Sequence, residues 1–236
     1  MEYRELSAEE FSDIESRILY EDNHLLVINK RVGEIVQGDK TGDECLAETL
    51  KAFKAKRDSK PGKVFMGIPH RLDRPVSGLC IFAKTSKALE RLSEMFRCSD
   101  IHKTYWALCC AKPAPAEGRL ENWLIRNEKQ NKAYIVAKPR GEAKLAKLNY
   151  RFLQSTERYH LVEVELLTGR HHQIRCQLSG IGCPIKGDLK YGAPRSNPDG
   201  GICLHARKIS FIHPVKKEPV EVTAPLPKEW KGISEV

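Results

Sequence analysis

Hydrophobic and polar residues follow two different periods along the first hundred residues of the chain. Residues 18–30 predict two short strands around an Asp-Asn turn, and the largely apolar stretch 77–85 is typical of a buried strand. Apolar residues recur at helical spacing in 42–56 and in 86–98. This part of the chain therefore predicts helices placed between strands.

After residue 100 the pattern is mainly that of strands. The stretches with a strand pattern are 102–111, 119–125, 144–155, 159–168, 202–214 and 218–225. Helical spacing returns once, in 171–182. Many strands with few helices between them predict an α+β fold with a mixed, mainly antiparallel sheet. Since composition marks no domain boundary, we expect a short polar lead with helical tendency at 1–17 and a single domain at 18–236.

Composition and charge narrow the class of protein. The chain has 236 residues, of which 41% are hydrophobic and 30% charged, and its net charge is +9. This length can bury a sizeable core, and such a positive excess favours a polyanionic partner, most often nucleic acid. The start of the chain is acidic and polar, and no apolar run approaches the length of a membrane span. We therefore expect a cytoplasmic protein that does not enter membranes.

Cysteines and histidines are numerous but are not spaced as metal ligands. No two of the eight cysteines have the C-x-x-C spacing, and the eight histidines include no H-E-x-x-H motif. We interpret the cysteines as reduced thiols, mostly buried. The sequence also lacks a nucleotide-binding Walker loop, so we expect neither a metal nor a cofactor.

A single carboxylate, Asp73, stands between Arg71 and Arg74 just ahead of the apolar run at 77–85. Two interpretations are open from the pattern alone. The aspartate could form a surface ion pair or a loop cap, or it could be a catalytic group whose ionised form is favoured by a nearby guanidinium. Gly78 permits a sharp backbone turn where the strand begins, and a loop held by a strand and a helix is a usual place for catalytic chemistry.

A second basic cluster follows in residues 166–192. It contains two arginines, two histidines and a helix-like segment, and Lys186 and Lys190 lie on either side of a Gly-Asp turn. Backbone amides at a helix start, together with these cations, suit a phosphate or sugar-phosphate chain. The alternative from the pattern is a solvated basic face.

Four segments, in order, give these residues a family resemblance. The stretch "HRLDRPVSGLCIFAKT" resembles the H-R-L-D-x-x-T-S-G-L-L signature of the RluA-type pseudouridine synthases. "YEDNHLLVINKRVG", "HKTYWALC" and "LLTGRHHQIRCQLSGIGCPIKGDLKYG" are similar to three further motifs of that family. The resemblance covers roughly residues 18–225. Some members carry an S4-type RNA-binding domain before the catalytic domain, and we expect none here.

A few positions depart from the family pattern. Arg31 stands where the family usually has proline, and Val76 replaces a threonine. Cys176 and Gln177 replace the usual Val-His pair, and Cys183 replaces a histidine. These changes affect the expected hydrogen bonds of the loops and leave the aspartate in place.

The resemblance implies a fold and a reaction. The expected fold is the pseudouridine synthase fold, a curved mixed sheet with flanking helices and a central cleft. The reaction isomerises uridine in ribosomal or transfer RNA: the glycosidic bond breaks, the uracil turns, and C5 joins C1'. Asp73 matches the essential carboxylate, which either attacks C1' or removes the C2' proton. Arg175 matches the arginine that keeps it ionised, and Tyr105 matches the tyrosine that stacks on the uracil.

The same resemblance implies residues that bind the substrate. Ile174 would pack against the other face of the base, in the manner of a pocket for an extruded nucleotide. His70 and Arg71 would help to fill the space that the base leaves. The residues expected along the phosphate path are Arg170, His172, Lys186 and Lys190. We expect RNA as the partner and a monomer as the working unit.

Two other classes of function are alternatives to this hypothesis. A catalytically inactive RNA-binding or ribosome-assembly factor with the same fold is compatible with the substitutions at Val76, Cys176 and Cys183. A hydrolase that acts on a small glycoside through Asp73 is less compatible, because the second acidic group typical of such sites is missing from the motif and the basic charge is left unexplained.

Overall fold

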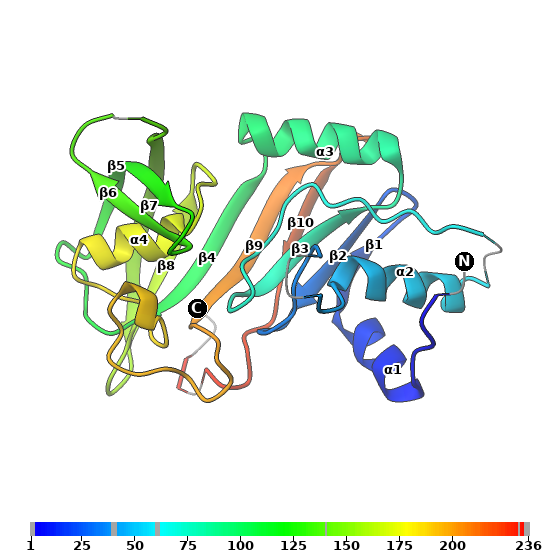
Figure 1. The fold of residues 1–236 in the computed structure, drawn as a ribbon, viewed down its shortest axis with the longest axis horizontal. Coiled ribbons are helices and arrows are strands. Elements are labelled where there is room, and N and C mark those ends of the chain that lie inside the picture. Colours follow the sequence, from blue (N-terminus) through cyan, green and yellow to red (C-terminus); the bar gives the residue numbers. More distant parts are fainter. Residues whose placement is uncertain (1–2, 39–41, 60–61, 140, 231, 234–236) are drawn as a thin grey trace. The chain divides into compact units, whose positions relative to one another are not determined.

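The computed structural model describes residues 3–38, 42–59, 62–139, 141–230 and 232–233 (Figure 1). The chain divides into two compact units. Unit 1 combines the residues up to 101 with 209–225, and unit 2 combines 102–208 with the residues after 225. The chain therefore passes from one unit to the other more than once, and each unit is described by itself.

Unit 1 is built from a small antiparallel sheet and three helices. Its elements are α1 (Ala8–Arg17), β1 (Ile18–Glu21), β2 (Leu25–Lys30), α2 (Leu46–Arg57), β3 (Ser77–Ala83), α3 (Ser86–Cys98) and β10 (Pro219–Thr223). β2 pairs with β1 on one side and with β3 on the other, and β10 pairs with β9 (Leu204–Ile212), whose last residues belong to this unit. The expected strands and helices of this region are confirmed.

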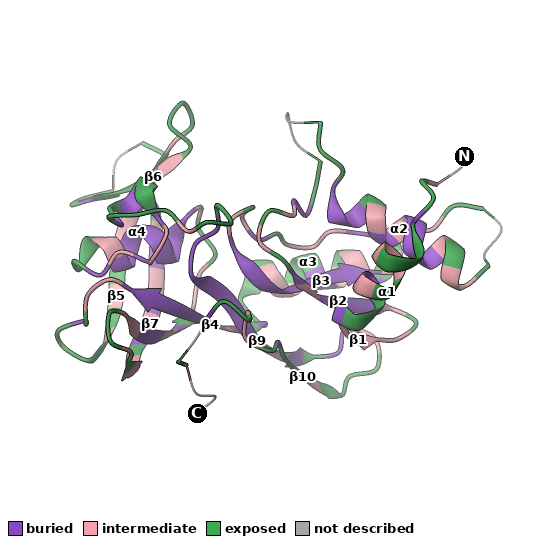
Figure 2. Ribbon diagram, turned by 90° about the horizontal axis from the view of Figure 1, so that it is seen from below, coloured by how far each residue is buried: buried purple, intermediate pink, exposed green. Residues whose placement is uncertain are grey.

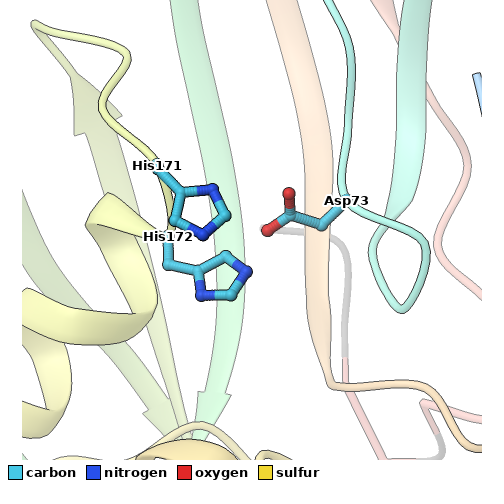
Figure 3. A group of neighbouring side chains, drawn as sticks. All are labelled: Asp73, His171 and His172. Atoms are coloured by element: carbon cyan, nitrogen blue, oxygen red, sulfur yellow. The ribbon is translucent and has the colours of Figure 1, made fainter. Parts of the chain in front are cut away.

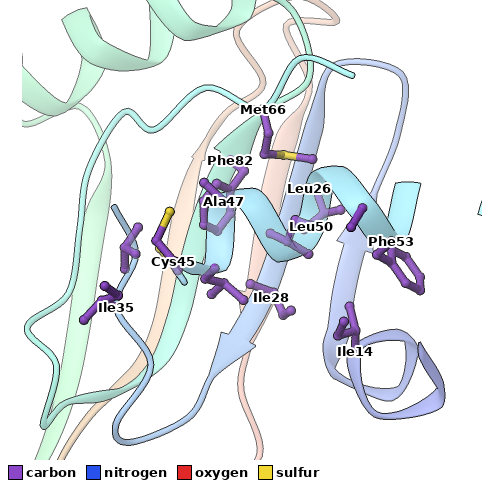
Figure 4. Close-up of a cluster of buried hydrophobic side chains, with 14 of the residues drawn as sticks. Ile14, Leu26, Ile28, Ile35, Cys45, Ala47, Leu50, Phe53, Met66 and Phe82 are labelled. Atoms are coloured by element: carbon purple, nitrogen blue, oxygen red, sulfur yellow. The ribbon is translucent and has the colours of Figure 1, made fainter. Parts of the chain in front are cut away.

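One face of the β2–β3 pair contributes to a large buried core of unit 1. Leu26 lies opposite Phe82 and Ile28 opposite Cys80, and side chains in direct register lie on the same face of an antiparallel pair. All four belong to a buried apolar cluster that also includes Leu50 and other residues of α1 and α2 (Figure 4). The helical spacing of 42–56 thus corresponds to an apolar stripe that α2 buries against the sheet.

The polar lead is a folded part of this core. Ser7 accepts a hydrogen bond from the backbone N–H of Glu10, and the Glu10 side chain accepts one from the Ser7 backbone, which is a complete capping box at the start of α1. Leu6 and Ile14 are buried in the apolar cluster. The lead therefore has the expected helix, and it contributes to the packing of unit 1.

Unit 2 is an antiparallel sheet with one main helix. Its elements are β4 (His102–Cys109), β5 (Glu117–Asn127), β6 (Lys132–Val136), β7 (Lys144–Ser155), β8 (His160–Leu166), α4 (Gln173–Gly180), the short 3₁₀ helix η1 (Leu189–Tyr191) and the first residues of β9. The strand order is β9-β4-β8-β7-β5-β6, and the β4–β8, β8–β7, β7–β5 and β5–β6 pairs are antiparallel.

The core of unit 2 lies between the sheet and α4. Leu124, Ala133 and Ala146, from three neighbouring strands, pack with Cys176 of α4 and with Tyr191. Figure 2 shows α4 largely in the buried colour. Among the described residues, no helix combines the length and apolar character needed to cross a membrane. The α+β class and the mainly antiparallel sheet are confirmed.

We predict that Phe53→Ala destabilises unit 1 by about 3–5 kcal/mol, the usual cost of removing a buried phenyl ring. Phe53 is fully buried and its ring centroid lies 4.6 Å from that of Phe11. Urea denaturation followed by circular dichroism measures the change. Phe65, whose side chain is 43% exposed, provides the control: Phe65→Ala should cost less than about 1 kcal/mol. Equal losses for the two variants would contradict this packing.

Candidate active site

Asp73 lies in a tight turn just before β3, at the end of the segment that follows α2. The backbone N–H of Val76 donates to the carbonyl oxygen of Asp73 at 3.0 Å, which closes the turn over residues 73–76. The Asp73 side chain leaves this turn and is half-buried (Figure 3). Gly78 follows with φ of 111°, a value that side-chain-bearing residues rarely adopt. Gly78 itself lies within β3, opposite Lys30, so the sharp turn falls at residues 73–76 and not at Gly78 as expected.

A buried lysine binds the backbone of the Asp73 turn. Lys30, at the end of β2, is 1% exposed, and its ammonium donates to the carbonyl oxygens of Val76 at 2.6 Å, Arg31 at 2.9 Å and Arg74 at 3.3 Å. Burial lowers the pKa of Lys30 to about 8, while the carboxylates of Glu34 and Asp73 act in the opposite direction. The turn that carries Asp73 is therefore fixed by a buried cation.

The basic neighbours of Asp73 have distinct surroundings. His70 accepts a hydrogen bond at Nε2 from the backbone N–H of Ile81 at 2.9 Å, and its ring stacks on Phe96 of α3 with 4.3 Å between centroids. Arg74 forms an exposed ion pair with Asp43 at 2.7 Å, and Arg71 is exposed. His70 thus helps to position the loop against β3 and α3.

The T-G-R-x-H-Q segment of unit 2 is closed by the side chain of Gln173. Its Oε1 accepts from the Thr168 hydroxyl at 2.8 Å and from the Arg170 backbone N–H at 3.0 Å. Its Nε2 donates to the Lys147 carbonyl on β7 at 3.0 Å. One amide side chain therefore ties the loop, the start of α4 and the sheet together.

Arg175 pairs with a carboxylate within its own unit. Its Nε and Nη2 donate to the two carboxylate oxygens of Asp188 at 2.6 and 2.8 Å, and both side chains are buried. Such a two-point contact fixes the plane of the guanidinium. The preceding Gly187 has φ of +88°, and a Cβ there would lie 2.6 Å from the Gly201 carbonyl oxygen. Only glycine allows the turn that presents Asp188.

His172 joins this network through Tyr191. Its Nδ1 lies 3.0 Å from the Tyr191 hydroxyl, and that hydroxyl accepts from the Ala133 N–H at 2.7 Å. His172 stands at the N-cap of α4 with a left-handed φ of 50°, and its ring stacks on that of His171 (Figure 3). Burial, assisted by the charge of Arg175, lowers the pKa of His172 to about 2. The imidazole is therefore neutral at physiological pH.

Tyr105 and Ile174 belong to the same layer of unit 2. Tyr105 lies opposite Val164 on β8, and Val164 lies opposite Tyr150 on β7. Direct register and the two-residue period place Tyr105 on the face of the sheet that carries Ala146 and packs against α4. Tyr105 and Ile174 are 8% and 5% exposed. Tyr105, Ile174, Arg175 and His172 are thus gathered on one side of this sheet.

The three remaining cations have protein contacts. Arg170 donates through Nε to the Leu145 carbonyl at 3.0 Å. The Lys186 ammonium lies 4.7 Å from the ring centroid of Tyr159, a cation–π distance. The Lys190 ammonium donates to the carbonyls of residues 130 and 131 at 3.3 and 3.0 Å. Arg170 and Lys190 are exposed and Lys186 is half-buried, so their phosphate contacts stay predictions.

The substituted positions of the fourth motif fill structural roles. Gln177 is fully buried and donates to the Asn122 side chain at 2.7 Å and to the carbonyls of Leu120 and Ala146. Cys176 packs in the unit 2 core, and Cys183 is buried. Gln177 and Cys176 connect α4 to the sheet.

Three residues that support the site were not predicted from the sequence. They are Lys30, at the Asp73 turn, and Asp188 and Tyr191, which contact Arg175 and His172. Each belongs to a quoted motif, Lys30 to "YEDNHLLVINK" and the other two to "KGDLKYG". The motifs therefore contained these three residues, but nothing in the motifs indicated which distant residues the three side chains contact. His70, Arg71 and Asp73 lie in unit 1, and the other seven predicted site residues lie in unit 2.

Comparison with known proteins gives a consistent result. Residues 24–180 match the family described as RNA pseudouridylate synthase. Ribosomal large subunit pseudouridine synthase C of Vibrio cholerae is 33% identical over 91% of this chain and 67% of that protein. Ribosomal large subunit pseudouridine synthase D of Zymomonas mobilis is 33% identical over 93% and 72%. The structure of human RNA pseudouridylate synthase domain containing 4 has a TM-score of 0.78, 27% identity, and coverage of 93% and 92%.

We predict that Asp188→Asn and Arg175→Gln each destabilise the protein by about 3–5 kcal/mol, because each leaves one buried charge without its partner. The double variant should cost less than the sum of the two, by about 0.5–3 kcal/mol, if the charges interact directly. Urea denaturation of the four proteins measures this coupling. Strictly additive losses would contradict the pair.

The low pKa of His172 predicts an acid-sensitive contribution to stability. Below pH 6.5 the unfolded chain takes up a proton at this residue that the folded protein does not. The free energy of unfolding therefore decreases as the pH is lowered, by up to about 1.4 kcal/mol per pH unit. Unfolding free energies measured from pH 7 to 5 should depend less steeply on pH for His172→Asn, because asparagine takes up no proton in this range. Asparagine is chosen because it tolerates the left-handed backbone. Identical slopes would rule out this role.

Proposed function

This chain belongs to the RNA pseudouridylate synthase family as an RluA-type isomerase, and on that premise we propose that it converts uridines of ribosomal RNA to pseudouridine with Asp73 as the essential carboxylate. The observation that carries the proposal is the Asp73 turn itself, within the matched residues 24–180 and fixed by Lys30. We propose ribosomal RNA as the substrate because the relatives from Vibrio cholerae and Zymomonas mobilis are both named for the large ribosomal subunit.

The reaction determines what the protein must supply. The bond between N1 and C1' breaks, the uracil turns within the site, C5 bonds to C1', and the proton of C5 leaves while N1 gains one. No water is consumed. Attack on C1' and removal of the C2' proton both need an ionised carboxylate held at a defined position. The Asp73 turn meets the positional requirement because both its ends are bonded, through Val76 and Lys30.

Arg175 and Tyr105 have complementary roles in the proposal. Arg175 has the role that the family resemblance implies, which is to keep the catalytic carboxylate ionised. A guanidinium carries five N–H donors, so its two bonds to Asp188 are compatible with a second partner. Tyr105 offers an aromatic ring for stacking on the uracil and Ile174 an apolar surface for its other face. Extrusion of the uridine from its stack costs a few kcal/mol, and less in an RNA loop.

Phosphate contacts would come from cations around this layer. Arg170, Lys186 and Lys190 supply positive charge at exposed or half-exposed positions, while neutral His172 acts by holding Tyr191 and the start of α4. Each phosphate contact should weaken as salt concentration rises. His70 and Arg71 remain our candidates for the space that the uridine vacates.

We predict that Asp73→Asn lowers turnover by at least about a thousandfold, as expected for a residue that takes part in the covalent chemistry. Release of tritium from ribosomal RNA labelled at uridine C5 measures turnover, and filter binding measures RNA affinity, which should stay within a few-fold of wild type. Asp43→Asn, a change of another unit 1 carboxylate in an exposed ion pair, is the matched control and should keep its activity.

Two results would count against the proposal. If Asp73→Asn kept a tenth or more of the wild-type rate, the carboxylate would not be essential. If the wild-type protein released tritium from transfer RNA but none from ribosomal RNA, the proposed substrate would be wrong even though the reaction was right.

A further inference from the structure

The hairpin formed by β5 and β6 carries features of a nucleic-acid contact that the proposed chemistry does not use. An open pocket of about 550 Å³ lies against it, within the range of sites that hold small organic groups. Its lining residues are Ile125, Arg126, Asn127, Glu128, Lys129 and Tyr134. We propose that this hairpin pocket binds an unpaired nucleotide of the RNA substrate, with the base stacked on Tyr134.

Tyr134 is held in a defined position although its side chain is solvent-exposed. The residue is 38% exposed, and its hydroxyl is hydrogen-bonded to the Gln130 side chain. It lies opposite Ile125 in the β5–β6 register, so the two side chains share one face of the hairpin. The Lys132 ammonium lies 5.2 Å from the Tyr134 ring centroid. An exposed aromatic ring with a fixed orientation is a stacking surface for a base.

The hairpin tip is anchored to the rest of unit 2. Lys190 donates to the carbonyls of residues 130 and 131, and the Tyr191 hydroxyl binds the Ala133 backbone. The Gln130 backbone N–H donates to the Asn127 side chain at 3.1 Å. These contacts arrange the turn before any ligand arrives, which reduces the entropy lost on binding.

Charge favours an anionic occupant. Arg126 and Lys129 line the pocket beside the carboxylate of Glu128, and the Lys132 ammonium lies at the Tyr134 ring. The Arg126–Glu128 pair is exposed, with a nitrogen–oxygen distance of 3.9 Å, so it neutralises little of this charge. A ring for stacking surrounded by cations matches single-stranded RNA better than a neutral protein surface.

The inference rests on the proposed function for the identity of the ligand, but its test does not depend on catalysis. Fluorescence anisotropy with a fluorescein-labelled oligouridine of about a dozen nucleotides measures binding to the intact protein. Tyr134→Ala should weaken binding at least about fivefold, the loss of one stacked base, whereas Tyr134→Phe should bind within about twofold of wild type. Lys129→Gln should reduce the slope of log affinity against log salt by about 0.7.

Matched controls lie close by in the chain. Ile135→Ala removes an exposed apolar side chain from the other face of the same strand, and Lys138→Gln removes an exposed lysine outside the pocket. Both should bind oligouridine like wild type. Thermal unfolding of each variant checks that the hairpin variants are folded.

Each outcome has a clear meaning. If folded Tyr134→Ala binds oligouridine like wild type, the pocket does not hold RNA and the inference is overturned. A protein occupant of the pocket would give this same result. A loss of similar size in Ile135→Ala would also overturn it, because the effect would then come from the hairpin as a whole. If the wild type binds RNA through Tyr134 but forms no pseudouridine, the proposed function fails and the hairpin inference stands.

Discussion

A lysine ammonium almost shielded from solvent holds the backbone that carries Asp73. An isolated buried charge is costly, and hydrogen bonds from Lys30 to three carbonyl oxygens offset that cost. Any shift of residues 74–76 would break one of these bonds and leave the ammonium short of partners. Because the pKa of Lys30 is about 8, the charge is mostly present at neutral pH. The position of the carboxylate is thus coupled to the core of unit 1.

Unit 2 uses a buried ion for the same purpose. The Arg175–Asp188 pair is buried, as is His172 beside it. Buried ion pairs add little net stability compared with apolar packing, but a broken pair is expensive. The guanidinium is therefore confined to one orientation. In both units, residues that the family resemblance assigns to catalysis stand on polar contacts that tolerate few alternative geometries.

The sequence predicted most elements of the fold because apolar periodicity is a local signal. The 86–98 stretch forms α3 with Thr85 as its N-cap, and the 144–155 stretch forms β7. β6 was missed: only five residues long, with two adjacent exposed apolar side chains, it gives no clear alternation.

Site chemistry was only partly readable from the sequence. The motifs identified Asp73 and Arg175, because unusual residue combinations identify a family. They did not identify Lys30 or Asp188 as supports, because those roles arise from contacts across 46 residues to Val76 and across 13 residues to Arg175. Hydrogen bonds between distant segments leave no periodic trace, so the supporting shell had to come from the structure.

The division of the chain between its units has a consequence for biosynthesis. Unit 1 needs residues 209–225, which supply the end of β9 and all of β10, yet these are made after nearly all of unit 2. A growing chain therefore carries the Asp73 turn on an incomplete sheet while the ribosome adds about a hundred further residues, a delay of several seconds at ordinary elongation rates. Translation speed and chaperone access in that interval bear on how much active enzyme a cell obtains.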